Sequence, residues 1–234
     1  MSDLLLPGRF LFRFAVPCPL REPLWSADGA GLDERCRLPS LAELEGRPAW
    51  ADVRAAWSPA GLAFSVRVSG KQQPPWCRAS RPEDSDGLQL WIDTRDVHNV
   101  HRAGRFCHRF IFLPRGGDHA DQRFASVPDG ARRLDEPVAL LQPIHRAREQ
   151  CRPVPPGQLQ VRSQPLSGGY LLEAFLPAEA LTGFDPQEHP RLGFTYAVLD
   201  RQLGEQTLGV GSPMPYQEDP SLWATLELRM KDQG

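Results

Sequence analysis

The sequence predicts an all-β fold: an antiparallel β-sandwich, a two-sheet architecture of jelly-roll or immunoglobulin-like type, with one or two short helices. The 234 residues include 24 prolines and 20 glycines, and so many residues that break helices and central strands indicate many turns and sheet edges. Short apolar runs recur between turn signals, which is typical of strands. This length suits one large sandwich. We therefore expect a single domain over 1–234, with a long irregular insertion around 114–157.

The elements of the N-terminal half follow from local patterns. Phenylalanines alternate with other residues over 9–16, which predicts a strand with one buried face. Ser40 and Glu43 have capping-box spacing, so a short helical turn is expected over 40–46. The turn-forming segment 58–61 joins apolar runs at 53–57 and 62–68, which predicts a β-hairpin.

The remaining strands are expected from residue 88 onward. A nearly continuous apolar run at 88–94 predicts a central strand, and alternation over 106–113 predicts a second one. Residues 138–147 fit either a short strand or a helical turn. The last elements are two strands around the turn 167–169, a one- or two-turn helix opened by Pro177, and two further strands. Those two strands are expected at 191–200 and 221–230.

The charge pattern argues against nucleic-acid and membrane partners. Twenty-seven basic and 29 acidic residues leave a net charge of −2 with both signs interspersed, which creates no broad positive field. No run approaches the roughly 18 apolar residues of a membrane span. Pro7, Arg9 and Arg13 interrupt any signal-peptide core. A cytoplasmic location is therefore expected, and so are reduced thiols at the five scattered cysteines, with two disulfides in a secreted protein as the alternative.

Enzyme signatures are absent from the sequence, and we expect a protein without catalytic activity. Cys107 and His108 are adjacent, but neighbours on a strand point to opposite faces and cannot form a nucleophile–base pair. A divalent metal site is the weaker alternative to a plain polar loop for four residues between two predicted strands. A hydrolase built on the same residues ranks last. The four residues are Asp93, Asp96, His98 and His101.

Two aromatic residues lie in polar loops rather than in strand patterns. Trp76 lies in a proline-rich loop, and Tyr216 lies in the segment PMPYQEDP. A large ring on a loop either packs against the domain or binds a ligand. Flat rings stack well on the apolar faces of a sugar, so saccharide binding and simple loop anchoring are equally open at this point.

The order of segments resembles the family 9 carbohydrate-binding modules and the broader DOMON-like sandwiches. The resemblance covers most of residues 50–230 and is carried by GLAFSVRVSG, SDGLQLWID, CHRFIF, GGYLLEAFLPAEAL, RLGFTYAVLD and DPSLWATLEL. It implies a non-catalytic module that holds a sugar between two aromatic rings. Structural calcium occurs in some members, but the acidic segment near the N-terminus that binds it has no counterpart here.

The resemblance also implies roles for particular residues. Trp76 and Tyr216 correspond to the two rings, Gln89 to a polar contact in the central strand, and Arg109 to a donor that binds vicinal hydroxyls. The chain departs from the pattern at Ala197, where the family has an amide. A saccharide is therefore the expected ligand and no cofactor is expected.

Two other functions remain open from the sequence. DOMON-like resemblance also allows a haem or redox module, for which Met214 would pair with His98, His101 or His108. The third possibility is a protein-interaction domain without a small ligand, in which the excursion over 114–157 provides the contact surface.

Overall fold

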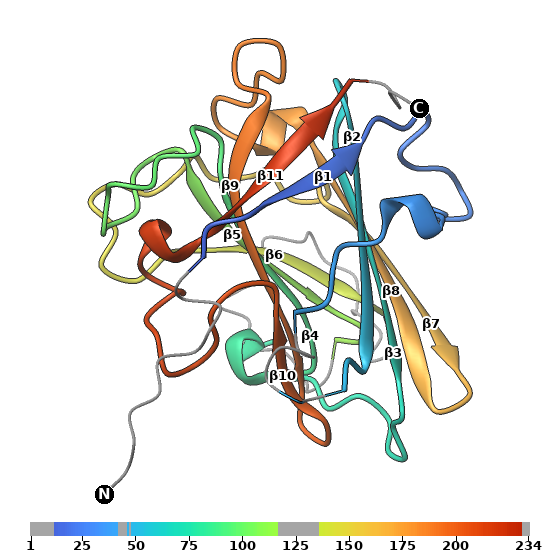
Figure 1. Cartoon of the computed structure of the whole chain (residues 1–234). Helices are drawn as coiled ribbons and strands as arrows, with labels where there is room; N and C mark the ends of the chain where they lie inside the picture. Colours follow the sequence, from blue (N-terminus) through green and yellow to red (C-terminus); the bar gives the residue numbers. More distant parts are fainter. Residues whose placement is uncertain (1–11, 42–45, 47, 117–135, 231–234) are drawn as a thin grey trace, which may run out of the picture.

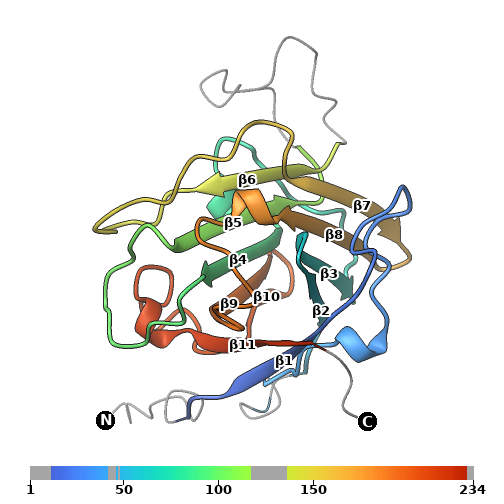
Figure 2. The ribbon, with the colours of Figure 1, turned by 90° about the horizontal axis from the view of Figure 1, so that it is seen from above.

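The computed structural model describes residues 12–41, 46, 48–116 and 136–230. Within these residues it contains eleven strands and four three-residue 3₁₀ helices. The strands form two sheets that face each other (Figures 1 and 2). This confirms the predicted all-β sandwich.

The larger sheet has the strand order β1-β11-β9-β4-β5-β6, with β10 paired to β9. All its pairs are antiparallel except β1 with β11, which run parallel. The central position of β4 confirms the predicted central strand, and every residue of β4 is buried. The bounds are β1 Ala15–Pro19, β4 Gly87–Asp93, β5 Cys107–Leu113, β6 Val138–Gln142, β9 Arg191–Asp200, β10 Gly204–Thr207 and β11 Ala224–Arg229.

The smaller sheet has the order β2-β3-β8-β7 and is antiparallel throughout. Its β2–β3 hairpin confirms the turn predicted over 58–61. Gly61 begins β3 with φ of 141°, and a Cβ there would lie 2.0 Å from the carbonyl oxygen of Leu176, so only glycine lets the two strands approach. The bounds are β2 Ala51–Ser58, β3 Gly61–Ser69, β7 Gln160–Leu166 and β8 Gly169–Pro177.

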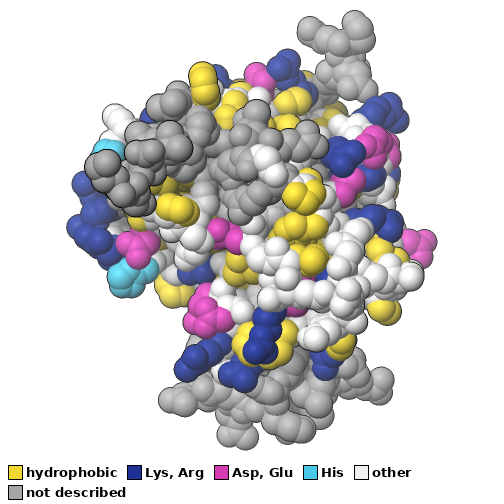
Figure 3. All heavy atoms as spheres, turned by 60° about the horizontal axis from the view of Figure 1, so that its bottom comes forward, with side chains coloured by type: hydrophobic (Ala, Val, Ile, Leu, Met, Phe, Trp, Pro, Cys, Tyr) yellow, Lys and Arg dark blue, Asp and Glu magenta, His cyan; other side chains and the backbone are white. Residues whose placement is uncertain are grey.

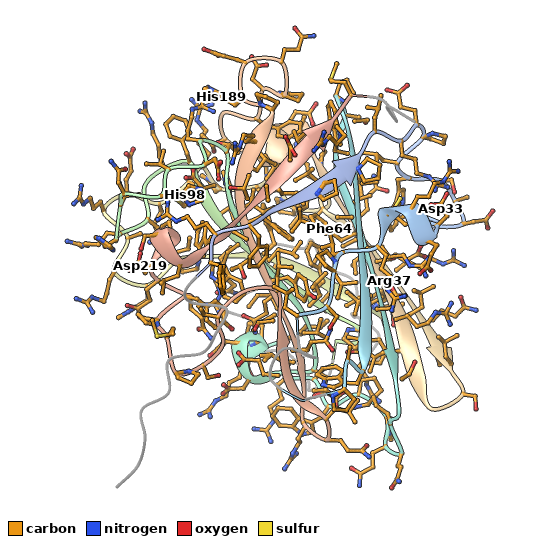
Figure 4. All side chains as sticks on the ribbon, in the orientation of Figure 1. Asp33, Arg37, Phe64, His98, His189 and Asp219 are labelled. Carbon is orange, nitrogen blue, oxygen red and sulfur yellow. The ribbon has the colours of Figure 1, made fainter. Side chains whose placement is uncertain are left out.

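The hydrophobic core lies between the sheets. Phe64 on β3 stacks on Phe194 of β9 with ring centroids 5.7 Å apart, and Figure 4 shows Phe64 near the middle of the sandwich. On β5, Phe110 and Phe112 point into this core while Ile111 packs on the other face. The alternation predicted for this strand is therefore confirmed.

The structure corrects the N-terminal strand. The strand is β1 at Ala15–Pro19 instead of 9–16, and Phe12 is 70% exposed; residues 9–11 lie outside the described part. The reason is position in the sheet, because an edge strand tolerates the missing N–H groups of Pro17 and Pro19. Pairing with β11 then sets the bounds.

Other elements differ from the sequence expectation in extent. The turn expected over 40–46 lies largely outside the described residues. The helix after Pro177 is only the 3₁₀ segment Ala178–Ala180, and the insertion around 114–157 contributes β6 to the larger sheet. β10 was not expected because Gly204–Thr207 has no apolar alternation. The side chain of Gln206 binds the backbone of residues 50 and 51 at the start of β2, which links the two sheets.

The sequence predicted reduced thiols at the five cysteines and no membrane-spanning segment. All five cysteines are free thiols, and only Cys151 is partly exposed. No helix in the described ranges is long and apolar enough to cross a membrane.

His108 is a titratable side chain buried in the core. It is fully buried and stacks on Phe110. Its Nε2 accepts the Thr182 N–H at 2.8 Å, and its Nδ1 lies 3.4 Å from the Ile92 carbonyl oxygen. Burial lowers the pKa of His108 to about 4, because a charged imidazole would lose its hydration and would oppose the Thr182 N–H.

We predict that His108 makes the protein less stable in acid. The pKa of His108 is ~6.5 in the unfolded chain and about 4 in the native protein. Protonation of His108 therefore favours the unfolded state as the pH falls between these values. The free energy of unfolding should be about 3 kcal/mol lower at pH 4 than at pH 7.5. Urea unfolding at both pH values should show a smaller loss in His108→Gln than in wild type or in the exposed-residue control His101→Gln. Equal losses of stability in the wild type and both variants would contradict this role of His108.

Candidate functional site

Three charged side chains are buried together at one end of the sandwich. Lys71 follows β3, Asp86 precedes β4 and Asp200 ends β9, and their side chains are 3%, 1% and 0% exposed. The Lys71 ammonium donates to Asp86 Oδ2 at 3.0 Å and also to Asp200 Oδ2. This end lies at the bottom of Figure 1, where the β9–β10 turn and the segment after β3 lie. We call these residues the ion cluster.

The ion cluster fixes the backbone on both sides of it. Asp86 accepts the N–H groups of Trp76 at 2.9 Å and of Arg201 at 2.7 Å. Asp200 accepts those of Gln202 and Leu203 in the β9–β10 turn. The loop that carries Trp76 is therefore attached to a turn more than a hundred residues later in the sequence.

Trp76 lies on the loop, partly exposed, as the sequence predicted. Its carbonyl oxygen accepts the Asp86 N–H at 2.8 Å, so the backbone is held on both its donor and its acceptor. The guanidinium groups of Arg78 and Arg201 lie 4.7 and 4.9 Å from the ring centroid, within cation–π range. Figure 3 brings this end forward and shows basic side chains beside hydrophobic ones. The contribution of Arg201 could not be read from the sequence, because only the turn at Asp200 brings it here.

The outer face of the larger sheet borders this loop. Cys77, next to Trp76, packs with Ile111 of β5. On the same face Gln89 and Trp91 of β4 lie beside Ala197 of β9 and Arg109 of β5, respectively. The face therefore combines apolar, amide and guanidinium groups.

Arg109 is only partly exposed and has few partners. Its guanidinium lies 5.2 Å from the Trp91 ring centroid and donates to Gln89 Oε1 at 2.8 Å. Its Nε is buried and has no hydrogen-bond partner. Burial lowers the pKa of Arg109, an effect that Glu83 and Tyr216 oppose. Arg109 therefore has N–H groups without a hydrogen-bond acceptor among the described residues.

Gln89 holds Arg109 in place and is itself covered. The side chain is 1% exposed, and its Nε2 donates to the Glu83 carbonyl oxygen at 3.0 Å while its Oε1 accepts from Arg109. The structure therefore corrects its predicted role from a direct ligand contact to a residue that positions Arg109.

Tyr216 is a core residue in the structure. It is 1% exposed, meets Trp91 edge-on with ring centroids 5.2 Å apart, and donates its hydroxyl to Glu205 Oε1 at 2.7 Å. Burial raises its pKa. This corrects the prediction of an exposed stacking platform. The ring packs on Trp91 and anchors its loop, because burial of its apolar surface stabilises the fold. A loop composition alone does not distinguish these outcomes.

Of the four metal candidates, only Asp96 and His98 form an ion pair with each other. Asp93 accepts the N–H groups of Arg95 and Val97 and thus caps a turn. Asp96 lies 2.9 Å from His98 Nε2. His101 Nδ1 lies 3.1 Å from Asp219; Figure 4 shows His98 and Asp219 on the same side of the sandwich. Nowhere in the described ranges do three or more His, Cys, Asp or Glu residues form a group suited to a metal.

One of the three residue pairs of the haem alternative lines a common hollow. Met214 and His101 line one hollow of about 420 Å³, whereas His98 and His108 are not among its lining residues. His108 is excluded as a ligand because its Nε2 already accepts a backbone N–H inside the core.

Comparison with known proteins supports the fold. No protein-family model and no curated protein sequence matches the chain. A family 9 carbohydrate-binding module from Caldicellulosiruptor kristjanssonii in complex with cellotriose aligns with a TM-score of 0.55 and 11% identity, over 94% of this chain and 96% of that chain. A family 9 module from the same organism in complex with glucose aligns with a TM-score of 0.55 and 10% identity, over 94% and 98% of the two chains. The predicted resemblance to family 9 modules is thereby confirmed for the fold, while the DOMON-like resemblance stays a prediction.

We predict that Tyr216 contributes to stability as a core residue does. Tyr216→Ala should lower the free energy of unfolding by about 3–5 kcal/mol, because it leaves a cavity against Trp91. Tyr216→Phe should cost only about 1 kcal/mol, the value of the hydrogen bond to Glu205. Urea unfolding measures both. An unchanged midpoint for Tyr216→Ala would show that the ring is not packed.

We predict a larger effect from the ion cluster than from surface charge. Lys71→Met leaves two buried carboxylates without their cation, so the free energy of unfolding should fall by about 3–5 kcal/mol. The control is Arg67→Gln, an exposed residue on β3, which should change stability by less than about 0.5 kcal/mol. Equal urea midpoints for the two variants would contradict the structural role of the cluster.

Proposed function

We propose that the chain binds a saccharide, without catalysing a reaction on it, where the Trp76 loop meets the outer face of the larger sheet. The observation that carries the proposal is Trp76. Its indole is partly exposed on a loop whose backbone is bound to the buried Asp86. A ring held in place before binding loses little conformational entropy when a sugar stacks on it.

Arg109 supplies the polar part of the proposed site. Its guanidinium is positioned by Gln89 and by the face of Trp91. The side chain is partly exposed, and in our proposal the terminal N–H groups that Gln89 does not accept donate to sugar hydroxyls or other acceptors. One planar fork of donors binds two neighbouring oxygens with defined geometry.

The structural neighbours support the same class of ligand. They were solved with cellotriose and with glucose. This chain differs in the second ring, because Tyr216 is buried, and at Ala197, which is fully buried and provides no amide. We therefore propose a site with one exposed ring and a guanidinium, in which the surface arginines Arg78 and Arg201 move aside from the Trp76 ring when a sugar stacks on it.

We predict that Trp76→Ala retains the fold and loses saccharide affinity. Removal of one stacking ring should weaken binding at least about tenfold on a glycan array and in titration calorimetry, as an aromatic contact of about 1.5 kcal/mol requires. The matched control is Trp25→Ala, because Trp25 is also partly exposed but stacks on Phe175 of the smaller sheet. Undiminished binding by Trp76→Ala would refute the site. Failure of the wild type to bind any glycan would refute the function and favour a protein partner.

A further inference from the structure

The outer face of the larger sheet carries a positive charge that the described residues do not neutralise. Arg109 makes its one hydrogen bond within the described part of the chain to a neutral amide, that of Gln89. Its Nε is buried without a partner. A guanidinium carries five N–H groups, so most of the Arg109 donors have no hydrogen-bond acceptor in this part of the chain.

The neutral side chains around Arg109 do not compensate its charge. Gln89 lies on β4, and Gln142 lies opposite Arg109 on β6. Trp91 covers one face of the guanidinium. The two strands that flank β5 thus present amide and indole groups beside Arg109 rather than a carboxylate.

Two acids linked to this face are also not ion-pair partners of Arg109. Glu83 is exposed and forms no ion pair with Arg109 among the described residues, although it opposes the lowering of the arginine pKa. Glu205 accepts the Tyr216 hydroxyl at 2.7 Å and the Ser212 hydroxyl at 2.6 Å. Each of the two Glu205 oxygens therefore already accepts a hydrogen bond from another residue.

A partly desolvated cation such as Arg109, which has no counter-ion among the residues that the structure describes, is in an unfavourable state. An anionic group that reaches it would regain this energy through charge-assisted hydrogen bonds, which are about twice as strong as neutral ones. A neutral sugar would fill the donors and leave the charge uncompensated.

We propose that this site selects a saccharide bearing a carboxylate, a uronic acid, whose two carboxylate oxygens accept N–H groups of Arg109. The inference rests on the proposed saccharide-binding function and adds the charge of the ligand to it. A planar carboxylate matches the planar fork of a guanidinium.

A second observation favours the same sign of ligand. The guanidinium of Arg201 lies over the Trp76 ring and has no carboxylate within ion-pair distance in the described ranges. A sugar stacked on Trp76 would thus contact positive charge from the β9–β10 turn as well as from β5, although the whole chain has a net charge of −2.

Titration calorimetry with three sugars of the same shape tests the proposal. D-glucuronate carries the carboxylate, D-glucuronamide replaces it with an uncharged amide, and D-glucose replaces it with a hydroxymethyl group. Wild-type protein should bind glucuronate at least about tenfold more tightly than either neutral sugar, the ratio expected for a charge-assisted hydrogen bond. The preference should shrink in high salt.

Two variants locate the preference at Arg109. Gln89→Glu places a carboxylate at the 2.8 Å contact and should abolish the preference for glucuronate. Arg109→Met keeps the apolar stem, removes the charge, and should do the same. Arg152→Gln, an exposed arginine outside this face, should keep the wild-type preference. A urea unfolding curve for each variant confirms that it is folded.

The outcomes separate this inference from the function on which it rests. Equal affinity for all three sugars overturns the acidic preference and leaves saccharide binding standing. A preference that persists in folded Arg109→Met or Gln89→Glu also overturns it, because the carboxylate would then bind elsewhere. No binding by any of the three sugars, or by a glycan array, overturns both.

Discussion

The buried contact of one lysine with two aspartates is the constraint on which the candidate site depends. Lys71 and Asp86 lie at the two ends of the β3–β4 connection, and Asp200 ends β9. Two buried carboxylates and one ammonium leave a negative charge, which is tolerable because backbone N–H groups also donate to the carboxylate oxygens. These N–H groups belong to the Trp76 loop and to the β9–β10 turn, so the hydrogen bonds that stabilise the buried charges also hold the candidate site in place.

Trp91 has a comparable role on the outer face of the larger sheet. Its ring packs edge-on with Tyr216, lies under the Arg109 guanidinium, and donates its Nε1 to the Gln217 carbonyl oxygen at 3.1 Å. One indole therefore buries the loop after β10 and supports the cation. This arrangement explains why Tyr216 is unavailable to a ligand while Arg109 remains partly accessible: the tyrosine occupies one part of the indole and the arginine another.

The parts of the candidate site differ in how well they could be predicted from the sequence. Trp76 was found because an indole in a proline-rich polar loop is unusual, and its placement agrees with the structure. Tyr216 had the same local context and is buried, because its environment is supplied by Trp91 from another strand. Gln89 and Arg109 were each predicted as a polar contact to the ligand. In the structure the two side chains bind each other, and Gln89 is buried with its amide bound to the Glu83 carbonyl oxygen.

Local patterns in the sequence determined the strands, the β2–β3 turn and the two-sheet class, because side-chain alternation and turn chemistry act over a few residues. Only the tertiary structure decided the edge pairing that defines β1, the recruitment of β6 from the insertion, and the polar strand β10. It also decided which side chains meet at the ion cluster and which guanidinium groups stay without a carboxylate. The pairing of β1 with β11 and the contact of Lys71 with Asp200 join residues more than a hundred positions apart, and such contacts leave no local pattern in the sequence.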